Sequence, residues 1–210
     1  MIIAVDGPAA SGKGTIAKAL ARHYHLPHLD TGLLYRAVAV SVLRMELDPE
    51  VEADCIAACG FDDLILADPA LRDDEAGKTA SIVSAHPLVR AALMQRQKRF
   101  AHQEGGAVLD GRDIGTVIAP DADAKLFVQA TPTIRAQRRH AELKARGREV
   151  SYDQVLADIR QRDKRDSSRD TAPLVPAGDA AFLDTTFLSV DAAVAKAIEL
   201  VEARRALRRG

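Results

Sequence analysis

The chain has 210 residues, of which 47% are hydrophobic and 28% are charged, a mixture that excludes a disordered or fibrous protein and suits a compact globular one. The formal net charge of −1 excludes a global field that would attract nucleic acid or an anionic membrane. No run approaches the roughly 18 apolar residues that span a bilayer, and the N-terminus lacks the features of a signal peptide. We therefore expect a cytoplasmic protein with neither membrane nor nucleic acid as a partner.

Short apolar runs alternate along the chain with longer amphipathic stretches, which is typical of an α/β protein with a parallel sheet. Five strands are predicted, at Ile2–Asp6, His28–Asp30, Ala107–Asp110, Lys125–Gln129 and Ala181–Asp184. The clearest helices are predicted at Lys13–Tyr24, Pro87–His102, Ser151–Ser167 and Ser189–Arg208. Three of the strands end in an aspartate just before a glycine-containing turn, at Asp6, Asp30 and Asp110. The carboxyl ends of parallel strands are where open α/β sheets bind ligands.

A glycine-rich segment lies between the first strand and the first helix. Glycines let backbone N–H groups turn toward a polyphosphate, and the helix N-terminus adds a partial positive charge. Lys13 matches the lysine of a P-loop, which contacts the transferring phosphate. The strict motif has Ser or Thr directly after the lysine, but here Gly14 intervenes, so Thr15 can bind Mg²⁺ either directly or through water. The predicted phosphate-binding residues are Gly7, Pro8, Ala9, Ala10, Ser11, Gly12, Lys13, Gly14 and Thr15.

A P-loop indicates nucleotide binding but not a particular reaction. The chain contains no asparagine and therefore lacks the Asn-Lys-x-Asp motif with which GTPase switches read guanine. No Gly-x-Gly-x-x-Gly motif follows the first strand, and a motor would normally be larger. A small-molecule kinase is favoured, and a non-catalytic nucleotide switch remains the alternative from another class.

Two segments interrupt the alternation of strands and helices. Residues of about 45–80 are crowded with aspartate and are predicted to form a mobile, solvent-facing insertion at the edge of the sheet. A second mobile segment, rich in arginine and lysine, surrounds Gly147. The predicted organisation is one domain over residues 1–210, with a core at about 1–38 and 105–210, an insertion at about 39–104 and a lid at about 138–155.

Arginines follow several of the predicted strands and end one long helix. Kinases need cations where two phosphate groups approach each other, because the repulsion must be offset. Arg162, Arg165 and Arg169 stand at i, i+3 and i+7, so a continued helix would direct all three the same way, and Asp166 between them could orient an arginine or accept from a ribose hydroxyl. The alternative is a solvated, self-paired helix face.

Together these segments resemble the bacterial cytidylate kinase family. The resemblance runs from Ile3 to about Val201 and is strongest in Gly7–Thr15, Leu29–Arg36, Leu109–Thr116 and Arg162–Pro176. It implies a P-loop kinase with a doubly wound five-stranded parallel sheet, a short acceptor-binding insertion and a lid. It also implies Mg²⁺-dependent transfer of the ATP γ-phosphate to CMP or dCMP by a monomer in pyrimidine nucleotide metabolism. Kinases for AMP, UMP, dTMP or shikimate remain alternatives that differ only in the acceptor.

The family pattern also implies roles for individual side chains. Lys13, Arg112 and Arg162 would be catalytic, with Lys13 and its loop holding the ATP phosphates and the two arginines contacting phosphate. Thr15 and Asp110 would lie near Mg²⁺. The acceptor's phosphate and sugar would be bound by Thr31, Tyr35, Arg36, Asp166 and Arg169. The cytosine edge would be read by Ser81, Arg90 and Asp113. In the family the insertion usually carries a small β-sheet, whereas here it is short, from Phe61 to about Lys78.

Overall fold

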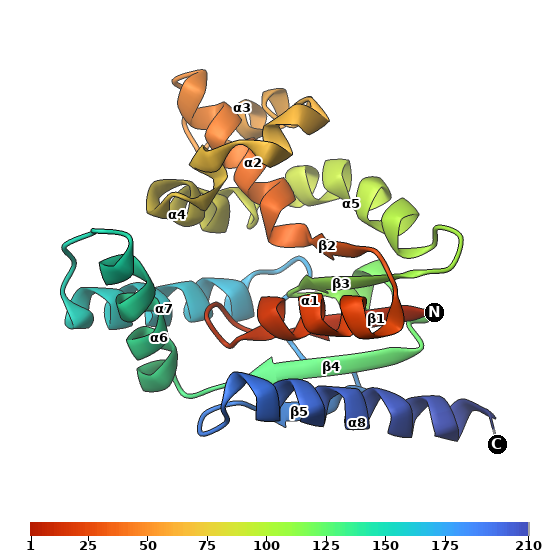
Figure 1. The fold of residues 1–210 in the computed structure, drawn as a ribbon. Coiled ribbons are helices and arrows are strands. Elements are labelled where there is room, and N and C mark those ends of the chain that lie inside the picture. Colours follow the sequence, from red (N-terminus) through yellow and green to blue (C-terminus); the bar gives the residue numbers. More distant parts are fainter. Residues whose placement is uncertain (210) are drawn as a thin grey trace. The chain divides into compact units, whose positions relative to one another are not determined.

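A computed structural model describes the backbone of residues 1–209 and the side chains of residues 1–207. The chain forms two compact units (Figure 1). The first unit comprises Met1–Leu29 and Ala101–Gly210, and the second comprises Asp30–Phe100. Within the described residues, no helix is both long and apolar enough to cross a membrane.

A five-stranded sheet in the order β2-β3-β1-β4-β5 forms the centre of the first unit. Its strands are β1 (Ile2–Asp6), β2 (His28–Asp30), β3 (Ala107–Gly111), β4 (Ala124–Gln129) and β5 (Ala181–Asp184). The pairs β1–β3, β1–β4 and β4–β5 are parallel, and Asp6 lies opposite Gly111 on one side and Phe127 on the other. The predicted doubly wound sheet is confirmed, with β3 and β4 each one residue longer than expected.

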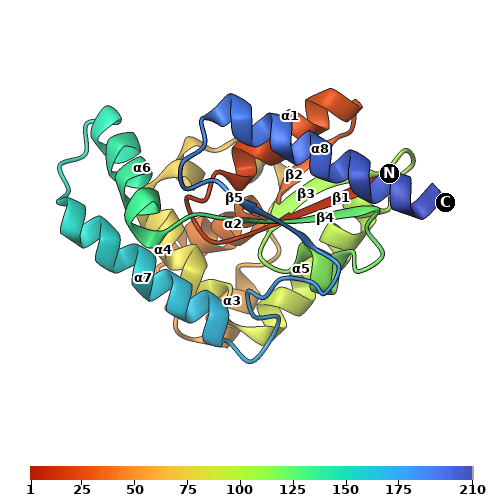
Figure 2. The same cartoon turned by 90° about the horizontal axis from the view of Figure 1, so that it is seen from below.

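Two helices, α1 (Lys13–Tyr24) and α8 (Val190–Arg209), cover one face of this sheet (Figure 2). Four-residue spacing places apolar side chains of α1 on a single stripe, which can therefore be buried as a unit. Strand residues from four strands meet the two helices in one buried cluster, whose larger members are Ile3, Val5, Ile16, Leu20, Val108, Leu126, Val128, Leu183 and Val201. This cluster anchors the start of α1, and with it the glycine-rich loop.

A helical hairpin and a short turn complete the first unit. The hairpin consists of α6 (Pro132–Ala145) and α7 (Tyr152–Ser168), which share a small core of Ala136, Leu143, Val155 and Ile159. The Ser151 hydroxyl accepts from Gln154 N at 3.1 Å and thereby caps the N-terminus of α7. A single π-helical turn, η3 (Ile114–Ile118), follows β3.

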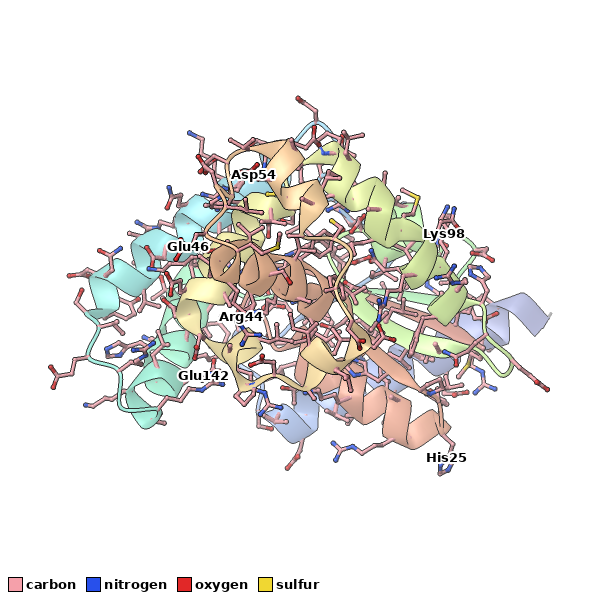
Figure 3. All side chains as sticks on the ribbon, turned by 90° about the horizontal axis from the view of Figure 1, so that it is seen from above. His25, Arg44, Glu46, Asp54, Lys98 and Glu142 are labelled. Atoms are coloured by element: carbon pink, nitrogen blue, oxygen red, sulfur yellow. The ribbon has the colours of Figure 1, made fainter. Side chains whose placement is uncertain are left out.

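The second unit is helical. Its elements are α2 (Thr31–Arg44), α3 (Glu52–Ala57), the 3₁₀ turns η1 (Asp63–Ala67) and η2 (Pro69–Arg72), α4 (Asp74–Val83) and α5 (Pro87–Ala101). Leu71 and Ala76 pack against Ala37 and Val40 of α2 in a buried cluster, whereas Arg44 and Glu46 at the end of α2 are exposed (Figure 3).

The prediction that residues 45–80 face the solvent is wrong for this cluster, because Leu71 and Ala76 are only 1% and 2% exposed. The aspartates that suggested an open segment have local structural roles. Asp62 accepts from Leu64 N at 2.8 Å, and Asp68 accepts from Ala70 N at 2.9 Å, so each caps a short 3₁₀ turn. Helix α4 was not among the predicted elements.

Candidate active site

The glycine-rich loop adopts a conformation that requires glycine at two points. Gly12 precedes α1 with φ of 90°, and Gly7 has φ of 154°. A Cβ on Gly7 would lie 2.0 Å from the carbonyl oxygen of Val128, so the loop passes directly against β4. Ala10 also has a positive φ, 58°, which is unusual for a residue with a side chain. The Ser11 hydroxyl oxygen is buried and has no hydrogen-bond partner among the described residues.

The loop is held from outside by residues to which the sequence motifs assign no role. Arg135 is buried, and its Nη1 donates to the Ala9 carbonyl at 3.2 Å while both of its terminal nitrogens bind Asp163 of α7. The Thr185 hydroxyl donates to the Ser11 carbonyl at 2.8 Å and accepts from Arg138 Nη1 at 3.0 Å. In the sequence, Arg135 and Arg138 are recognisable only as members of an arginine-rich stretch. The composition of that stretch predicts a mobile lid and does not indicate that these side chains support the phosphate loop.

Asp110 lies at the end of β3, close to the first turn of α1. One carboxylate oxygen is 2.8 Å from His28 Nε2, and the other would be 3.6 Å from a Cβ on Gly14. The described residues contain no group of three or more His, Cys, Asp or Glu side chains that could hold a metal ion. The Asp110 carboxylate and the Thr15 hydroxyl nevertheless offer the oxygen ligands that Mg²⁺ prefers, and Mg²⁺ usually takes its remaining ligands from substrate phosphates and water.

The turn after β3 carries Arg112 and Asp113 and is clamped by a buried carboxylate. Asp6 accepts from Ile114 N at 2.9 Å and from Gly115 N at 2.8 Å. Burial raises the pKa of Asp6 to about 6, and the two N–H groups oppose that rise. In the sequence Asp6 is recognisable only as a strand-end residue, so its clamping role emerges from the fold.

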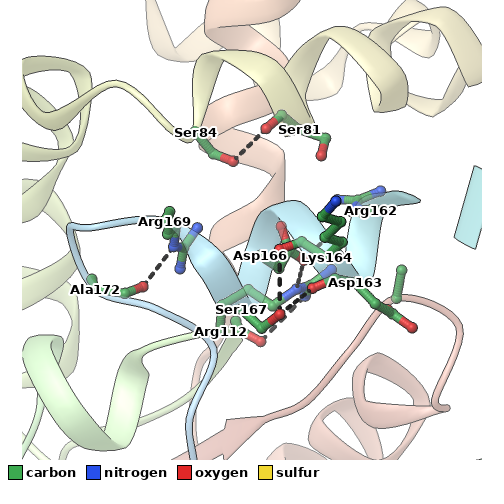
Figure 4. A network of polar contacts seen from close by, with 12 residues as sticks. Ser81, Ser84, Arg112, Arg162, Asp163, Lys164, Asp166, Ser167, Arg169 and Ala172 are labelled. Carbon is green, nitrogen blue, oxygen red and sulfur yellow. Dashed lines mark hydrogen bonds and ion pairs between the residues drawn. The ribbon is translucent and has the colours of Figure 1, made fainter. Parts of the chain in front are cut away.

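An arginine cluster surrounds Asp166, which is 3% exposed (Figure 4). Arg112 Nε donates to Asp166 Oδ2 at 2.8 Å, and Arg162 Nε lies 3.9 Å from the same oxygen. Burial alone would raise the pKa of Asp166, but the charges of Arg112 and Arg162 outweigh it and hold that pKa below its usual range. The prediction that Asp166 could orient an arginine is therefore confirmed.

The expected alignment of Arg162, Arg165 and Arg169 along one helix is wrong. Helix α7 ends at Ser168, and Arg169 has extended backbone angles of −68° and 142°. Arg169 Nε instead donates to the Ala172 carbonyl at 2.6 Å (Figure 4). Its direction is thus set by the loop after α7 and not by helical periodicity.

The predicted acceptor residues of the second unit form two groups. Thr31 and Tyr35 are buried in α2, and the guanidinium of Arg90 lies 5.5 Å from the centre of the Tyr35 ring. Ser81 is buried near the end of α4, where its carbonyl accepts from the Ser84 hydroxyl at 3.2 Å.

Arg90 Nη1 in turn donates to the Ser84 carbonyl at 3.2 Å, so Ser81 and Arg90 share a neighbour. Arg36 Nη1 donates to the carbonyls of Leu71 at 2.8 Å and Asp73 at 3.0 Å. Asp113 belongs to the first unit, so the joint reading of cytosine by Ser81, Arg90 and Asp113 stays a prediction.

A phosphate loop lies between the first strand and the first helix of a doubly wound parallel sheet, and Arg112, just after β3, is oriented by Asp166. This combination is typical of a P-loop kinase. The family model described as cytidylate kinase matches residues 3–203. A protein of Xanthobacter autotrophicus named cytidylate kinase is 59% identical over 98% of this chain and 99% of its own length. A protein of Rhodopseudomonas palustris with the same name is 53% identical over 100% of this chain and 99% of its own length.

The chain therefore belongs to the cytidylate kinase family, and it is an enzyme, a nucleoside monophosphate kinase. Two solved structures share the fold. A protein of Eubacterium ventriosum has a TM-score of 0.55 at 20% identity, covering 97% of this chain and 98% of its own. A protein of Thermus thermophilus has a TM-score of 0.51 at 25% identity, covering 97% of this chain and 96% of its own. The resemblance inferred from the motifs is confirmed.

Proposed function

We propose that this kinase transfers the γ-phosphate of ATP to CMP or dCMP, giving ADP and CDP or dCDP in pyrimidine nucleotide metabolism. The observation that carries the proposal is the phosphate loop with Lys13 in a chain that the cytidylate kinase model matches over residues 3–203. We also propose that it acts as a cytoplasmic monomer. Light scattering with and without nucleotides tests the monomer.

On the donor side, the backbone N–H groups of the loop and the ammonium of Lys13 bind the ATP phosphates. The positive φ values of the loop support this role, because they allow successive N–H groups to point toward one anion. Thr15 and Asp110 would hold Mg²⁺. When bound, Mg²⁺ offsets negative charge on the phosphate oxygens.

On the acceptor side, Arg36, Arg112 and Arg162 bind the phosphate of the nucleoside monophosphate and offset its repulsion of the ATP γ-phosphate. An oxygen of the acceptor phosphate attacks the γ-phosphorus as the bond to ADP breaks. That oxygen is already anionic, so no general base is required. Catalysis then consists of positioning and charge stabilisation, and Asp166 contributes by fixing Arg112. Thr31, Tyr35, Asp166 and Arg169 contact the acceptor's phosphate and sugar.

Base selection follows from hydrogen-bonding chemistry. Cytosine presents a donor at its 4-amino group and acceptors at N3 and O2, whereas uracil has an acceptor at O4 and a donor at N3. An ionised Asp113 can only accept, so it pairs with the amino group and repels O4. Arg90 and Ser81 can donate to N3 and O2.

ADP release measured with CMP, dCMP, UMP, AMP and dTMP tests the proposal. We expect CMP and dCMP to be the best acceptors and ATP hydrolysis without acceptor to be slow. Lys13→Ala serves as the catalytic control, with kcat lower by at least about 10²-fold because one preorganised donor is lost. Vigorous ATPase activity without any acceptor would instead favour a nucleotide switch, and preference for another monophosphate would reassign the acceptor.

A further inference from the structure

The guanidinium of Arg36 lies on the surface of helix α4 within the second unit. Its Nη1 donates to two carbonyl oxygens, that of Leu71 at 2.8 Å and that of Asp73 at 3.0 Å. The Asp73 carbonyl also accepts from Gly77 N at 3.1 Å, in the first turn of α4. Arg36 is therefore anchored to backbone groups that the end of η2 and the start of α4 already hold in place.

Gly77 occupies the point of closest approach between α4 and this guanidinium. A Cβ on Gly77 would lie 2.7 Å from Arg36 Nη2 and 3.1 Å from both Cζ and Nη1. The three nearest atoms all belong to the terminal part of the guanidinium, so the Cβ would meet the end of the side chain that carries Nη1 and Nη2. Contacts below about 3.0 Å between such atoms are repulsive, so a side chain at this position would displace Arg36.

Backbone conformation offers no other reason for glycine at this position. Gly77 lies inside α4 and is not among the glycines with positive φ. Glycine in a helix interior is unfavourable relative to alanine by roughly 1 kcal/mol. The helix would therefore be more stable with alanine, and what glycine provides is the space that the guanidinium fills.

We propose that Gly77 is a positioning residue of the kinase. By lacking a side chain it lets the guanidinium of Arg36 lie close against α4, where the Leu71 and Asp73 carbonyls hold Nη1 and set the direction of the group. The inference rests on the proposed function in one respect, which is the assignment of Arg36 to the phosphate of the acceptor. It adds that the space above α4 determines how well that phosphate is bound.

The test is steady-state kinetics of Gly77→Ala with CMP and ATP varied separately. We expect the KM for CMP to rise about tenfold, since displacement of a binding group by about an ångström costs one to two orders of magnitude. The KM for ATP should stay within twofold, and Tm should not fall, because alanine favours the helix. Gly60→Ala is the matched control. Gly60 lies in the same unit without a positive φ, and a Cβ added there would meet no atom within 4 Å, so neither KM should change.

A double-mutant cycle identifies Arg36 as the intermediary. If Gly77 acts through Arg36, adding Gly77→Ala to Arg36→Ala should change the KM for CMP by less than twofold, because the displaced group is gone. Should Gly77→Ala alone lower Tm, the Arg36→Ala background provides the room for the new Cβ, and Tm should recover there.

Separate results overturn the inference and the function on which it rests. An unchanged KM for CMP in Gly77→Ala, together with a large increase in Arg36→Ala, would overturn the inference alone. The inference alone would also be overturned if Gly77→Ala weakened CMP binding equally in the wild type and in Arg36→Ala. An unchanged KM for CMP in Arg36→Ala would overturn the phosphate-binding role of Arg36 and the inference with it.

Discussion

Arg36 in the second unit and Arg112 in the first are both expected to bind phosphate, yet the two units hold them by different chemistry. Arg36 donates to the backbone carbonyls of Leu71 and Asp73. Arg112 donates to the buried carboxylate of Asp166, and its turn is clamped by a second buried carboxylate, Asp6. Carbonyl oxygens do not titrate and cannot be replaced by substitution, whereas a carboxylate can be protonated or removed.

The difference indicates how each unit should respond to change. A buried ion pair is costly to break when one partner is lost, so Arg112 depends on the Asp166 carboxylate for stability as well as for direction. The Arg36 site depends on backbone geometry and on the absence of a side chain at Gly77. Charge substitutions and pH should therefore act mainly on the first unit, and steric substitutions on the second.

The largest effect is expected for the selectivity between CMP and UMP, which distinguishes a residue that recognises the base, Asp113, from one that binds the phosphate, Arg36. Asp113→Ala should narrow the ratio of kcat/KM for CMP over UMP by up to about 10⁴-fold, because the site loses the acceptor that pairs with the cytosine amino group. Arg36→Ala should lower activity with both nucleotides about equally, because it contacts the phosphate that they share. Steady-state kinetics of both variants with CMP, dCMP and UMP measures this. An unchanged CMP/UMP ratio in Asp113→Ala would leave Asp113 with a structural role only.

A second prediction compares Gly7 and Gly77, two glycines at which an added Cβ would be in steric conflict with a neighbour. Gly7→Ala places a Cβ 2.0 Å from a backbone carbonyl of β4 at a positive φ, so nothing flexible can move aside. We expect about 4 kcal/mol of lost stability, from backbone strain and overpacking together, and much weaker ATP binding. Chemical denaturation of Gly7→Ala and Gly77→Ala, side by side, checks this. Equal stability of the two variants would contradict the distinction between rigid and flexible neighbours.

Removal of the Asp166 carboxylate should have the next largest effect. Asp166→Asn leaves Arg112 and Arg162 without their buried counter-charge, and we expect about 3 kcal/mol of lost stability and at least about 10²-fold lower kcat/KM for CMP. Asp170→Asn removes the same charge from an exposed position just beyond the same helix and is the control. Urea denaturation and CMP kinetics measure both effects. If both variants behaved alike, Asp166 would not anchor Arg112.

The smallest effect concerns pH and the clamp at Asp6. A carboxyl whose folded pKa, about 6, exceeds its unfolded value near 4 contributes stability that is present below pH 4 and is lost as pH rises through 6. Between pH 4 and 7 the loss amounts to at most about 3 kcal/mol, from roughly two pKa units. Asp6→Asn should lack this part of the pH dependence.

Denaturation of the wild type and of Asp6→Asn at pH 4, 5, 6 and 7 measures the clamp. Identical pH profiles would show that Asp6 does not titrate as its burial indicates. The carbonyl anchor of Arg36 cannot add to either profile, which makes the comparison specific to the first unit.

Most of the regular structure could be predicted from local sequence, and the predicted helix Lys13–Tyr24 matches α1 at both ends. Strands were recognisable as short apolar runs that end in aspartate or a glycine turn, and α1 was recognisable from its four-residue spacing. Helix α4 was missed because its acidic first turn and Gly77 resemble a loop. The end of α7 at Ser168 lies one residue from the predicted end of that helix. Only the expected alignment of Arg169 was wrong, because the charge pattern continues past Ser168 while the helical backbone does not.

The sequence by itself determined the sheet, the phosphate loop and the family, because each depends on patterns within a dozen residues or on motifs in a set order. The tertiary structure alone decided what holds those motifs in place. Asp6 meets Ile114 and Gly115 across 108 and 109 positions, and Thr185 meets Ser11 across 174. Such contacts form only when the sheet brings distant strand ends together, and no local pattern encodes which donor will meet which acceptor.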